Sequence, residues 1–356
     1  MENKKAHIYN LIIVDESGSM SYLKKATMNG INSTINTIRK AQKEFVNTQV
    51  HTLSLVTFSS GSGGAKVQAV INNEPISQVK TFKDYTPNGG TPLYDAIGFS
   101  LSTLYNYIKA DKDATAVVTI LTDGLENSST DWTVDALRSF IEKLKAEGWS
   151  FSYMGSDHDV KQVTDLLSID NVIEFSHNDI GVDSTWVHES SSRRAYYEKM
   201  NTMYGEDNIT ADEIMERKRN FAREYYGARV TPDRIRHLNE NEIFVFGSNS
   251  AGFHNGGAAQ VAMIKFGAVW GQGEGLQGNS YAIPTTGFFE NMVQAINRFI
   301  DFAIRNPQKR FLVTHIGCGN AGYMAEQIAP YFKECVKLEN VALPAEFWTA
   351  LGLRMF

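Results

Sequence analysis

Short apolar runs rich in β-branched residues alternate with amphipathic stretches throughout the first half of the 356-residue chain. This alternation is typical of βα units around a largely parallel sheet. We therefore expect an α/β fold with a doubly wound, Rossmann-like sheet, in which ligands gather at the carboxyl ends of strands. The expected strands are 7–14, 52–58, 67–71, 116–121, 150–154 and 171–174, and the expected helices are 23–46, 93–110, 134–146 and 160–167.

The composition limits the kinds of function that the chain can have. Its length predicts two domains, and a net charge of −6 without a dense basic stripe argues against general nucleic-acid binding. No apolar stretch approaches the roughly 20 residues that span a bilayer, and no hydrophobic signal segment follows the amino terminus. We therefore expect a cytoplasmic protein without a membrane partner. Cys318 and Cys335 are too few for a zinc cluster or a disulfide framework.

Oxygen-bearing side chains occur in three separate segments, two of which lie at or just after expected strand ends. Asp15, Ser17 and Ser19 follow the first strand, Thr91 lies in a Gly-Gly-Thr-Pro turn, and Asp123 follows the strand 116–121. Ser and Asp before a helix are also ordinary caps, but the three segments together offer hydroxyls and carboxylates to one hard divalent cation. Such a shell neutralises the ion incompletely and leaves a position for an acidic group from outside.

This constellation resembles the metal-ion-dependent adhesion site of von Willebrand factor A (VWA) domains, whose pattern is Asp-x-Ser-x-Ser, then a Thr, then an Asp. The resemblance covers residues 1–190 and implies that Mg²⁺ or Mn²⁺ holds an acidic side chain of a partner protein. We expect the A-type domain to span residues 1–205 and a helical connector to span 206–228. The chain from Val182 to about Tyr226 is polar and helix-prone, and we expect its first part to close the A-type domain as a final helix. The alternative, in which this whole segment packs on one of the domains, remains open.

The second half of the chain contains three glycine-rich loops, at 247–259, 271–278 and 317–322, and two of them follow expected strands. Further strands are expected at 242–246, 280–284 and 310–316, with a helix at 292–305. Glycines allow successive N–H groups to converge on an anion, and a helix that follows adds its positive end. A phosphate-bearing ligand is therefore expected. The Gly-x-Gly-x-x-Gly spacing occurs at 273–278 and 317–322, but neither copy has the context of a dinucleotide fold.

Residues 229–356 resemble a macro domain, a smaller three-layer α/β/α module that binds ADP-ribose and related NAD-derived nucleotides. Stacking of Phe253 or Tyr323 on a base or ribose and ordinary packing of these rings both remain open. The resemblance places in the ligand site Asn249, Gly256, Gly257, Ala258, Gly317, Cys318, Gly319, Asn320, Ala321, Gly322 and Tyr323.

The resemblance assigns no catalytic residue. In macro domains that hydrolyse ADP-ribosyl bonds, a Lys follows the middle strand and an acidic residue lies beside the last loop, whereas Thr285-Thr286 and Tyr323 stand there in this chain. His254 and His315 belong to the residue type best suited to proton transfer near neutrality, but we expect the first to be a hydrogen-bonding or surface residue and the second to lie in the core.

Three functions follow from these patterns. The first is a metal-dependent protein-binding module fused to a nucleotide-binding macro-like domain. The second is an ADP-ribosyl hydrolase or nucleotide-processing enzyme that the A-type domain directs to a target. The third is a scaffold in which only the metal site acts and the glycine loops are structural.

Overall fold

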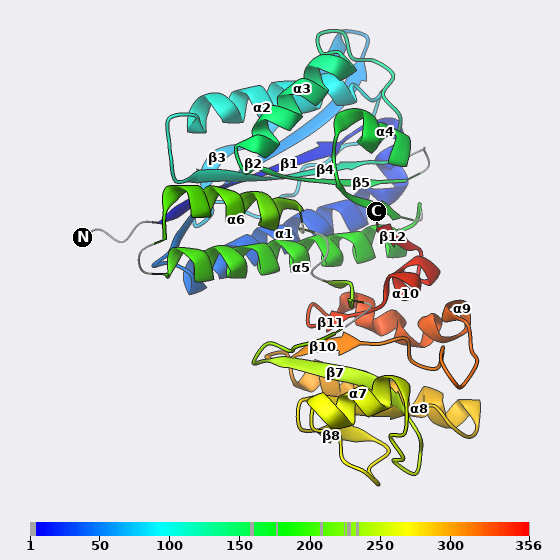
Figure 1. Cartoon of the computed structure of the whole chain (residues 1–356). Helices are drawn as coiled ribbons and strands as arrows, with labels where there is room; N and C mark the ends of the chain where they lie inside the picture. The colour runs from blue at the N-terminus through cyan, green and yellow to red at the C-terminus, as the bar shows by residue number, and fades with distance from the viewer. Residues whose placement is uncertain are drawn as a thin grey trace. The chain divides into compact units, whose positions relative to one another are not determined.

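The computed structural model describes residues 5–156, 160–175, 177–206, 209–223, 225, 229–232 and 235–355. The chain divides into two compact units, one formed by Met1–Gly227 together with Arg354–Phe356 and the other by Ala228–Leu353. Each unit is built on its own mostly parallel sheet with helices around it (Figure 1), which confirms the expected α/β class. Within the described residues, no helix is both long enough and apolar enough to cross a membrane.

The sheet of the first unit runs in the order β12-β6-β5-β4-β1-β2-β3. Parallel pairs join β1 to β2 and β4, β4 to β5, and β5 to β6, whereas β3 pairs antiparallel with β2. Without β12 the order is that of a doubly wound sheet, which reverses at β1 and places the carboxyl ends of β1 and β4 side by side. The strands are β1 (Ala6–Asp15), β2 (Gln49–Gly61), β3 (Gly64–Pro75), β4 (Ala114–Thr122), β5 (Ser150–Gly155), β6 (Asn171–Phe175) and β12 (Leu353–Met355).

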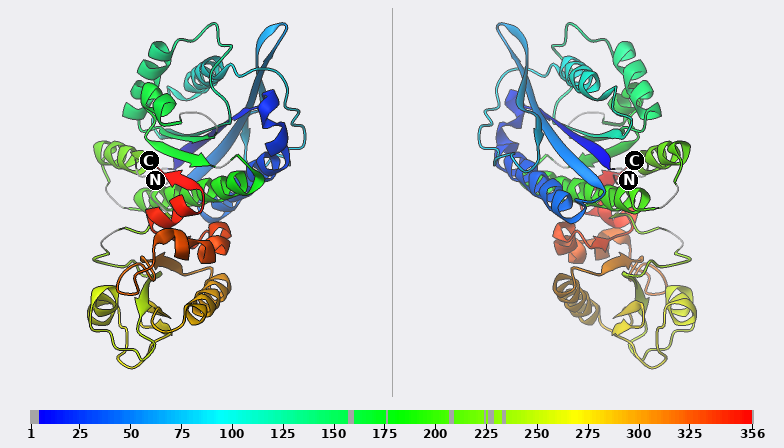
Figure 2. Two further views of the ribbon diagram at one scale, coloured as in Figure 1. Left: turned by 90° about the vertical axis from the view of Figure 1, so that its right-hand side faces the viewer. Right: turned by 90° about the vertical axis from the view of Figure 1, so that its left-hand side faces the viewer.

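Helices cover both faces of this sheet (Figure 2). The helices α1 (Lys24–Glu44) and α5 (Asp179–Tyr204) pack together on one face, and the short helix η1 (Gly18–Leu23) precedes α1. The opposite face carries α2 (Leu93–Ile108), α3 (Val134–Ala146) and α4 (Val160–Leu167), which share one hydrophobic core with the strands. Because both faces are buried, the central strands read as continuous apolar runs rather than as alternating patterns.

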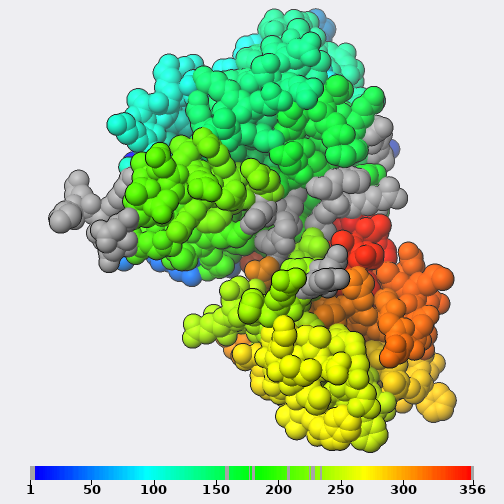
Figure 3. All heavy atoms as spheres, viewed as in Figure 1, coloured from blue at the N-terminus to red at the C-terminus, as the bar shows by residue number. Residues whose placement is uncertain are grey.

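A further helix of the first unit, α6 (Ala211–Arg223), forms within the segment 206–228 that we expected to be a helical connector. It packs against α5 and β5, and Ile214 and Lys218 are buried, with Lys218 Nζ donating to the carbonyl of Ala114 at 3.0 Å. Its outer face lies on the surface of the unit (Figure 3). This part of the segment therefore packs on the first unit, while residues 207–208, 224 and 226–228 lie outside the described range.

The sheet of the second unit runs in the order β11-β10-β7-β9-β8, with all pairs parallel except β8 with β9. The helices α7 and α8 lie on opposite sides of it (Figure 2), which gives three layers. The elements are β7 (Glu242–Ser248), α7 (Gly257–Lys265), β8 (Gly275–Gln277), β9 (Ser280–Pro284), α8 (Phe289–Arg305), β10 (Arg310–Val313), α9 (Ala325–Ile328), η3 (Ala329–Lys337), β11 (Val341–Ala342) and α10 (Ala345–Ala350).

Two predictions about the second unit were wrong in detail. The expected strand 310–316 ends at Val313, because the chain turns when the Ile316 N–H bonds the Thr314 carbonyl at 2.7 Å. The glycine-rich stretch 271–278 contains the strand β8 instead of a loop alone. Gly278 has a φ of +53°, and a Cβ there would lie 3.0 Å from the carbonyl oxygen of Phe266. This glycine therefore allows a close backbone approach within the unit.

Candidate functional site

The carboxylate of Asp15 lies at the carboxyl end of β1 and is fully buried. Its Oδ1 accepts the N–H of Ser17 at 2.7 Å, and its Oδ2 accepts the hydroxyl of Thr122 at 2.6 Å. Thr122 is the last residue of β4, so the two neighbouring strands meet through this bond. Uncharged donors thus fix the orientation of the carboxylate.

The other predicted metal ligands come to the same edge of the sheet. The hydroxyls of Ser17 and Ser19 lie 3.1 Å apart, and Ser19 donates to Oδ1 of Asp123 at 2.6 Å. A Cβ on Gly124 would lie 3.2 Å from Oγ1 of Thr91, which shows that this hydroxyl lies beside the turn that follows Asp123. The structure therefore gathers all five predicted residues from three distant segments, and their role as ligands stays a prediction.

Several residues that position this site were missed by the sequence analysis. Asp95, in the first turn of α2, is buried and accepts the backbone N–H groups of residues 130–132 at 2.8 to 3.0 Å. Asn127 Oδ1 accepts the N–H of Thr91 at 2.9 Å. These bonds attach the loop after β4 to the start of α2. A side chain that bonds to a distant backbone segment leaves no periodic pattern in the sequence. The one available signal was that Asp95 lies only four residues after Thr91.

A glycine controls the approach of the Thr91 turn to the first segment. Gly89 has a φ of +81°, and a Cβ there would lie 1.7 Å from the carbonyl oxygen of Ser60. Its own carbonyl accepts the N–H of Gly18 at 3.0 Å. Only glycine tolerates this conformation and this contact, so the turn depends on it.

The electrostatics of the site favour a cation. Burial, with a smaller contribution from the charge of Asp123, raises the pKa of Asp15 to about 6, although the hydrogen bonds from Thr122 and Ser17 oppose this rise. Burial, and then the charge of Asp15, also raises the pKa of Tyr85, whose hydroxyl donates to the Asp15 carbonyl. Two buried carboxylates concentrate negative charge that a divalent ion would neutralise. The donor set of carboxylates and hydroxyls suits a small, hard cation such as Mg²⁺ or Mn²⁺.

A histidine that was not among the predicted site residues also lies close to this site. His177, just after β6, places its Nδ1 3.8 Å from Oδ2 of Asp123 and 3.2 Å from Oγ of Ser156. Its contact is with a carboxylate of the site and with a hydroxyl that follows β5. The sequence signal that would have found it is its position at a strand end.

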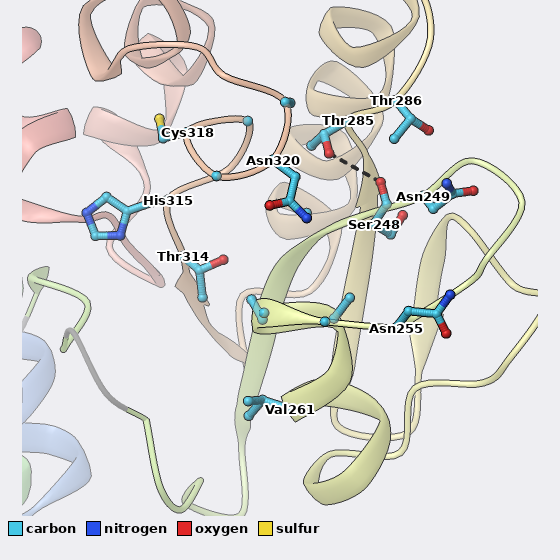
Figure 4. A pocket seen from close by; sticks show the side chains of 18 of the residues that line it. Ser248, Asn249, Asn255, Val261, Thr285, Thr286, Thr314, His315, Cys318 and Asn320 are labelled. Atoms are coloured by element: carbon cyan, nitrogen blue, oxygen red, sulfur yellow. Dashed lines mark hydrogen bonds between the residues drawn. The ribbon is translucent and has the colours of Figure 1, made fainter.

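The second unit contains a cavity of about 1020 Å³ at the carboxyl ends of β7, β9 and β10 (Figure 4). Gly322 is not among the described residues that line it; its φ is +77° and its N–H donates to the Gly319 carbonyl at 2.9 Å, so it closes the turn of this loop. The other predicted residues all line the cavity, namely Asn249, Gly256, Gly257, Ala258, Gly317, Cys318, Gly319, Asn320, Ala321 and Tyr323.

Two groups of backbone donors border this cavity. In α7 the first intrahelical bond runs from Gln260 N–H to the Gly256 carbonyl, so the N–H groups of residues 257–259 have no acceptor within the helix. Across residues 235–355, the N–H groups of 319–321 make no hydrogen bond to a backbone carbonyl. Such concave rows of N–H groups, one of them at a helix N-terminus, bind anions.

Hydroxyl and amide side chains complete the lining. Asn249 Oδ1 accepts the N–H of Ala251 at 2.7 Å, so this oxygen serves its own loop. Thr285 Oγ1 donates to the Ser248 carbonyl at 3.3 Å (Figure 4) and Thr286 Oγ1 accepts the N–H of Ser250 at 3.0 Å. The two threonines were not predicted as binding residues. They follow β9 directly, which is the signal that the sequence offered.

The two histidines have roles that differ from each other. His254 is buried, does not line the cavity, and donates from Nε2 to the Val269 carbonyl at 3.1 Å, so it holds two loops together. His315 was expected in the core, and that was wrong: it lines the cavity and pairs with Glu346 at 2.8 Å, partly in solvent. Its strand, β10, ends two residues earlier, at Val313, so the His315 side chain is not held in the sheet.

Cys318 also lines the cavity. Burial, and then the charges of nearby glutamates, raises the pKa of the Cys318 thiol.

No protein-family model matches the chain, and no curated protein matches it. The pilus adhesin SpaC from Lactobacillus rhamnosus GG is 15% identical with a TM-score of 0.39 over 52% of this chain and 30% of its own length. The SpRpn10 VWA domain is 11% identical with a TM-score of 0.37, over 51% of this chain and 93% of that one. The manganese-loaded TRAP protein of Plasmodium vivax is 19% identical with a TM-score of 0.30, over 44% and 58%. At these values the fold assignment rests on the strand order of the chain itself.

Proposed function

We propose that the first unit is a metal-dependent protein-binding module. Asp15, Ser17, Ser19, Thr91 and Asp123 would hold Mg²⁺ or Mn²⁺, either directly or through water. When bound, the ion supplies a Lewis-acidic position that an acidic side chain of a partner protein can complete. The observation that carries this proposal is the pair of buried carboxylates, Asp15 and Asp123, which hydroxyls link at the ends of adjacent strands.

The test is capture of partner proteins by the immobilised full-length chain with and without EDTA. We expect EDTA and the variant Asp15→Ala to abolish the same captured species. Asp165→Ala is the matched control, because Asp165 is an exposed carboxylate on α4 paired with Lys161. Capture that survives both EDTA and Asp15→Ala would overturn the proposal.

We further propose that the second unit is a macro-like module that binds ADP-ribose or a related NAD-derived nucleotide. The two rows of backbone N–H groups at 257–259 and 319–321 support it, because both border one cavity and both suit phosphate oxygens. Backbone amides, hydroxyls and side-chain amides, which are binding groups, line the cavity together with apolar side chains, His315 and Cys318, and the role that we propose is recognition. The two units together would bring a protein partner to a nucleotide or to a nucleotide-modified group.

Isothermal titration of the full-length chain with ADP-ribose tests this second proposal. Gly319 lines the cavity, and a Cβ there would meet no atom within 4 Å, so a side chain fits without a clash. Gly319→Glu should abolish binding because its carboxylate repels the phosphates, whereas Gly319→Ala should retain it. Equal binding by both variants, or no binding by the unaltered chain, would overturn the proposal.

A further inference from the structure

One ring of an exposed aromatic pair, Phe253, lines the cavity of the second unit; the other, Trp270, packs against it and is not among the described lining residues. Phe253 is 50% exposed and Trp270 is 53% exposed. Their ring centroids are 5.3 Å apart and the rings are tilted by 31° to each other. Half-exposed aromatic rings leave part of their apolar surface in water. Such surface next to a cavity is commonly a contact surface for a ligand.

The loops that carry these rings are fastened together. Gly252 accepts the N–H of Gly271 at 3.0 Å, and a Cβ on Gly252 would lie 2.4 Å from the Gln272 nitrogen. His254 donates to Val269 on the other loop, and Ser248 donates to the Gly273 carbonyl. These bonds join the two loops to each other, so they fix the positions of the two aromatic rings in the absence of a ligand.

The position of the pair relates it to the anion-binding groups. Phe253 lines the same cavity as residues 257–259, and this row of N–H groups begins four residues after Phe253. Tyr323 lines the cavity from the other glycine loop and packs on Phe289 with centroids 5.1 Å apart. The cavity thus has an aromatic side chain beside each of its two rows of backbone donors.

We infer that this cavity accepts a dinucleotide that carries an aromatic base beyond the diphosphate, with that base stacked on the Phe253–Trp270 pair. The inference rests on the proposed nucleotide function and names its ligand class more narrowly. ADP-ribose carries a single aromatic base, its adenine, on one side of the diphosphate and ends in a sugar on the other. In the orientation we infer, the sugar end faces the aromatic pair, so the pair stays uncovered until a second ring, a nucleobase or a nicotinamide-type ring, is attached to that sugar. Every such ring has a π face that stacks on Trp or Phe, and a positively charged ring gains a cation–π interaction with Trp.

The experiment compares NAD⁺ with ADP-ribose by isothermal titration of the full-length chain. NAD⁺ has the same diphosphate with an added ring, so we expect it to bind roughly 5- to 100-fold more tightly. Trp270→Ala and Phe253→Ala should remove this advantage and leave the affinity for ADP-ribose unchanged. Ile264→Ala is the matched control, because Ile264 is a 69% exposed apolar side chain on α7 that does not line the cavity.

The possible outcomes separate the inference from the proposal on which it rests. Binding of ADP-ribose with no advantage for NAD⁺, or an advantage that both variants retain, overturns the inference and leaves the nucleotide proposal standing. If neither ligand binds, both the inference and the nucleotide proposal are overturned. Thermal melting of each variant shows that it is folded, and since both rings are half exposed, either variant alone suffices for the test.

Discussion

Ser19 is the residue that joins the two halves of the candidate metal site. Its hydroxyl lies 3.1 Å from that of Ser17 and donates to Asp123 at 2.6 Å. We expect Ser19→Ala to weaken Mn²⁺ binding by roughly 10- to 100-fold, because a ligand and the orientation of a carboxylate are both lost. Titration calorimetry measures this. Ser102→Ala, which removes a hydroxyl bonded only within α2, is the control, and equal effects of the two changes would contradict the assignment.

His51 makes the first unit sensitive to acid. Burial, and then the nearby charge of Arg193, lowers its pKa from 6.5 to about 3. Between these two pH values the unfolded chain binds the proton and the folded chain does not, so stability is full above pH 6.5 and falls as the pH decreases toward 3. The expected loss approaches about 1.4 kcal/mol for each pH unit within this window.

The variant His51→Phe removes the titrating group, together with the bond between His51 Nε2 and Gln49 Oε1 at 3.0 Å. The phenyl ring retains the edge contact that His51 makes with Tyr197, at 4.6 Å between centroids, but it cannot take up a proton. We expect its free energy of unfolding to depend less steeply on pH between 4 and 6 than that of the unaltered chain, as measured by urea denaturation. Parallel pH profiles for the two proteins would show that His51 does not titrate as described.

At the scale of elements, the turn before α2 depends on Gly89. The variant Gly89→Ala would place a Cβ 1.7 Å from the Ser60 carbonyl and would force a side chain into positive φ. We expect a loss of roughly 2 kcal/mol or more in unfolding free energy, together with weaker metal binding because Thr91 shifts. Gly61→Ala, where a Cβ meets nothing within 4 Å, should change neither quantity. A stable Gly89→Ala variant with normal metal affinity would refute this account.

The sequence predicted the long elements well and the short ones poorly. Strands such as β1 and β4 span ten and nine residues that are rich in apolar and β-branched side chains, and amphipathic helices such as α3 carry a clear period, so both could be located. In contrast, β8 and β11 have three and two residues, which is too short for a period to appear. The strand order could not be read from the sequence either, because pairing depends on contacts between distant segments.

The candidate sites show the same division. The Asp-x-Ser-x-Ser segment and the glycine loops carry local patterns, so their residues could be named in advance. The positions of Asp95, Asn127 and His177 depend on the way the loops fold back, and Thr285 and Thr286 are ordinary residues until the cavity is known. Local chemistry was therefore predictable, whereas the residues that support it were not.

At the scale of the whole molecule, each unit has its own sheet and its own candidate ligand. A ligand that binds only the folded state stabilises it by about 2.7 kcal/mol at a concentration of 100 times Kd. In a thermal scan we expect Mn²⁺ to raise the melting temperature of the first unit and ADP-ribose to raise that of the second. Asp15→Asn should remove only the metal effect and Gly319→Glu only the nucleotide effect. Loss of both effects in either variant would contradict separate sites.

The most direct test of the central claim is isothermal titration of the full-length chain with Mn²⁺. We predict one saturable site in the unaltered chain and in Asp165→Asn, an exposed control, and no measurable binding in Asp15→Asn or Asp123→Asn. Those two variants keep the size of the side chain and remove the charge that the ion requires. Saturable binding of equal affinity in all four proteins would place the metal elsewhere and contradict the account.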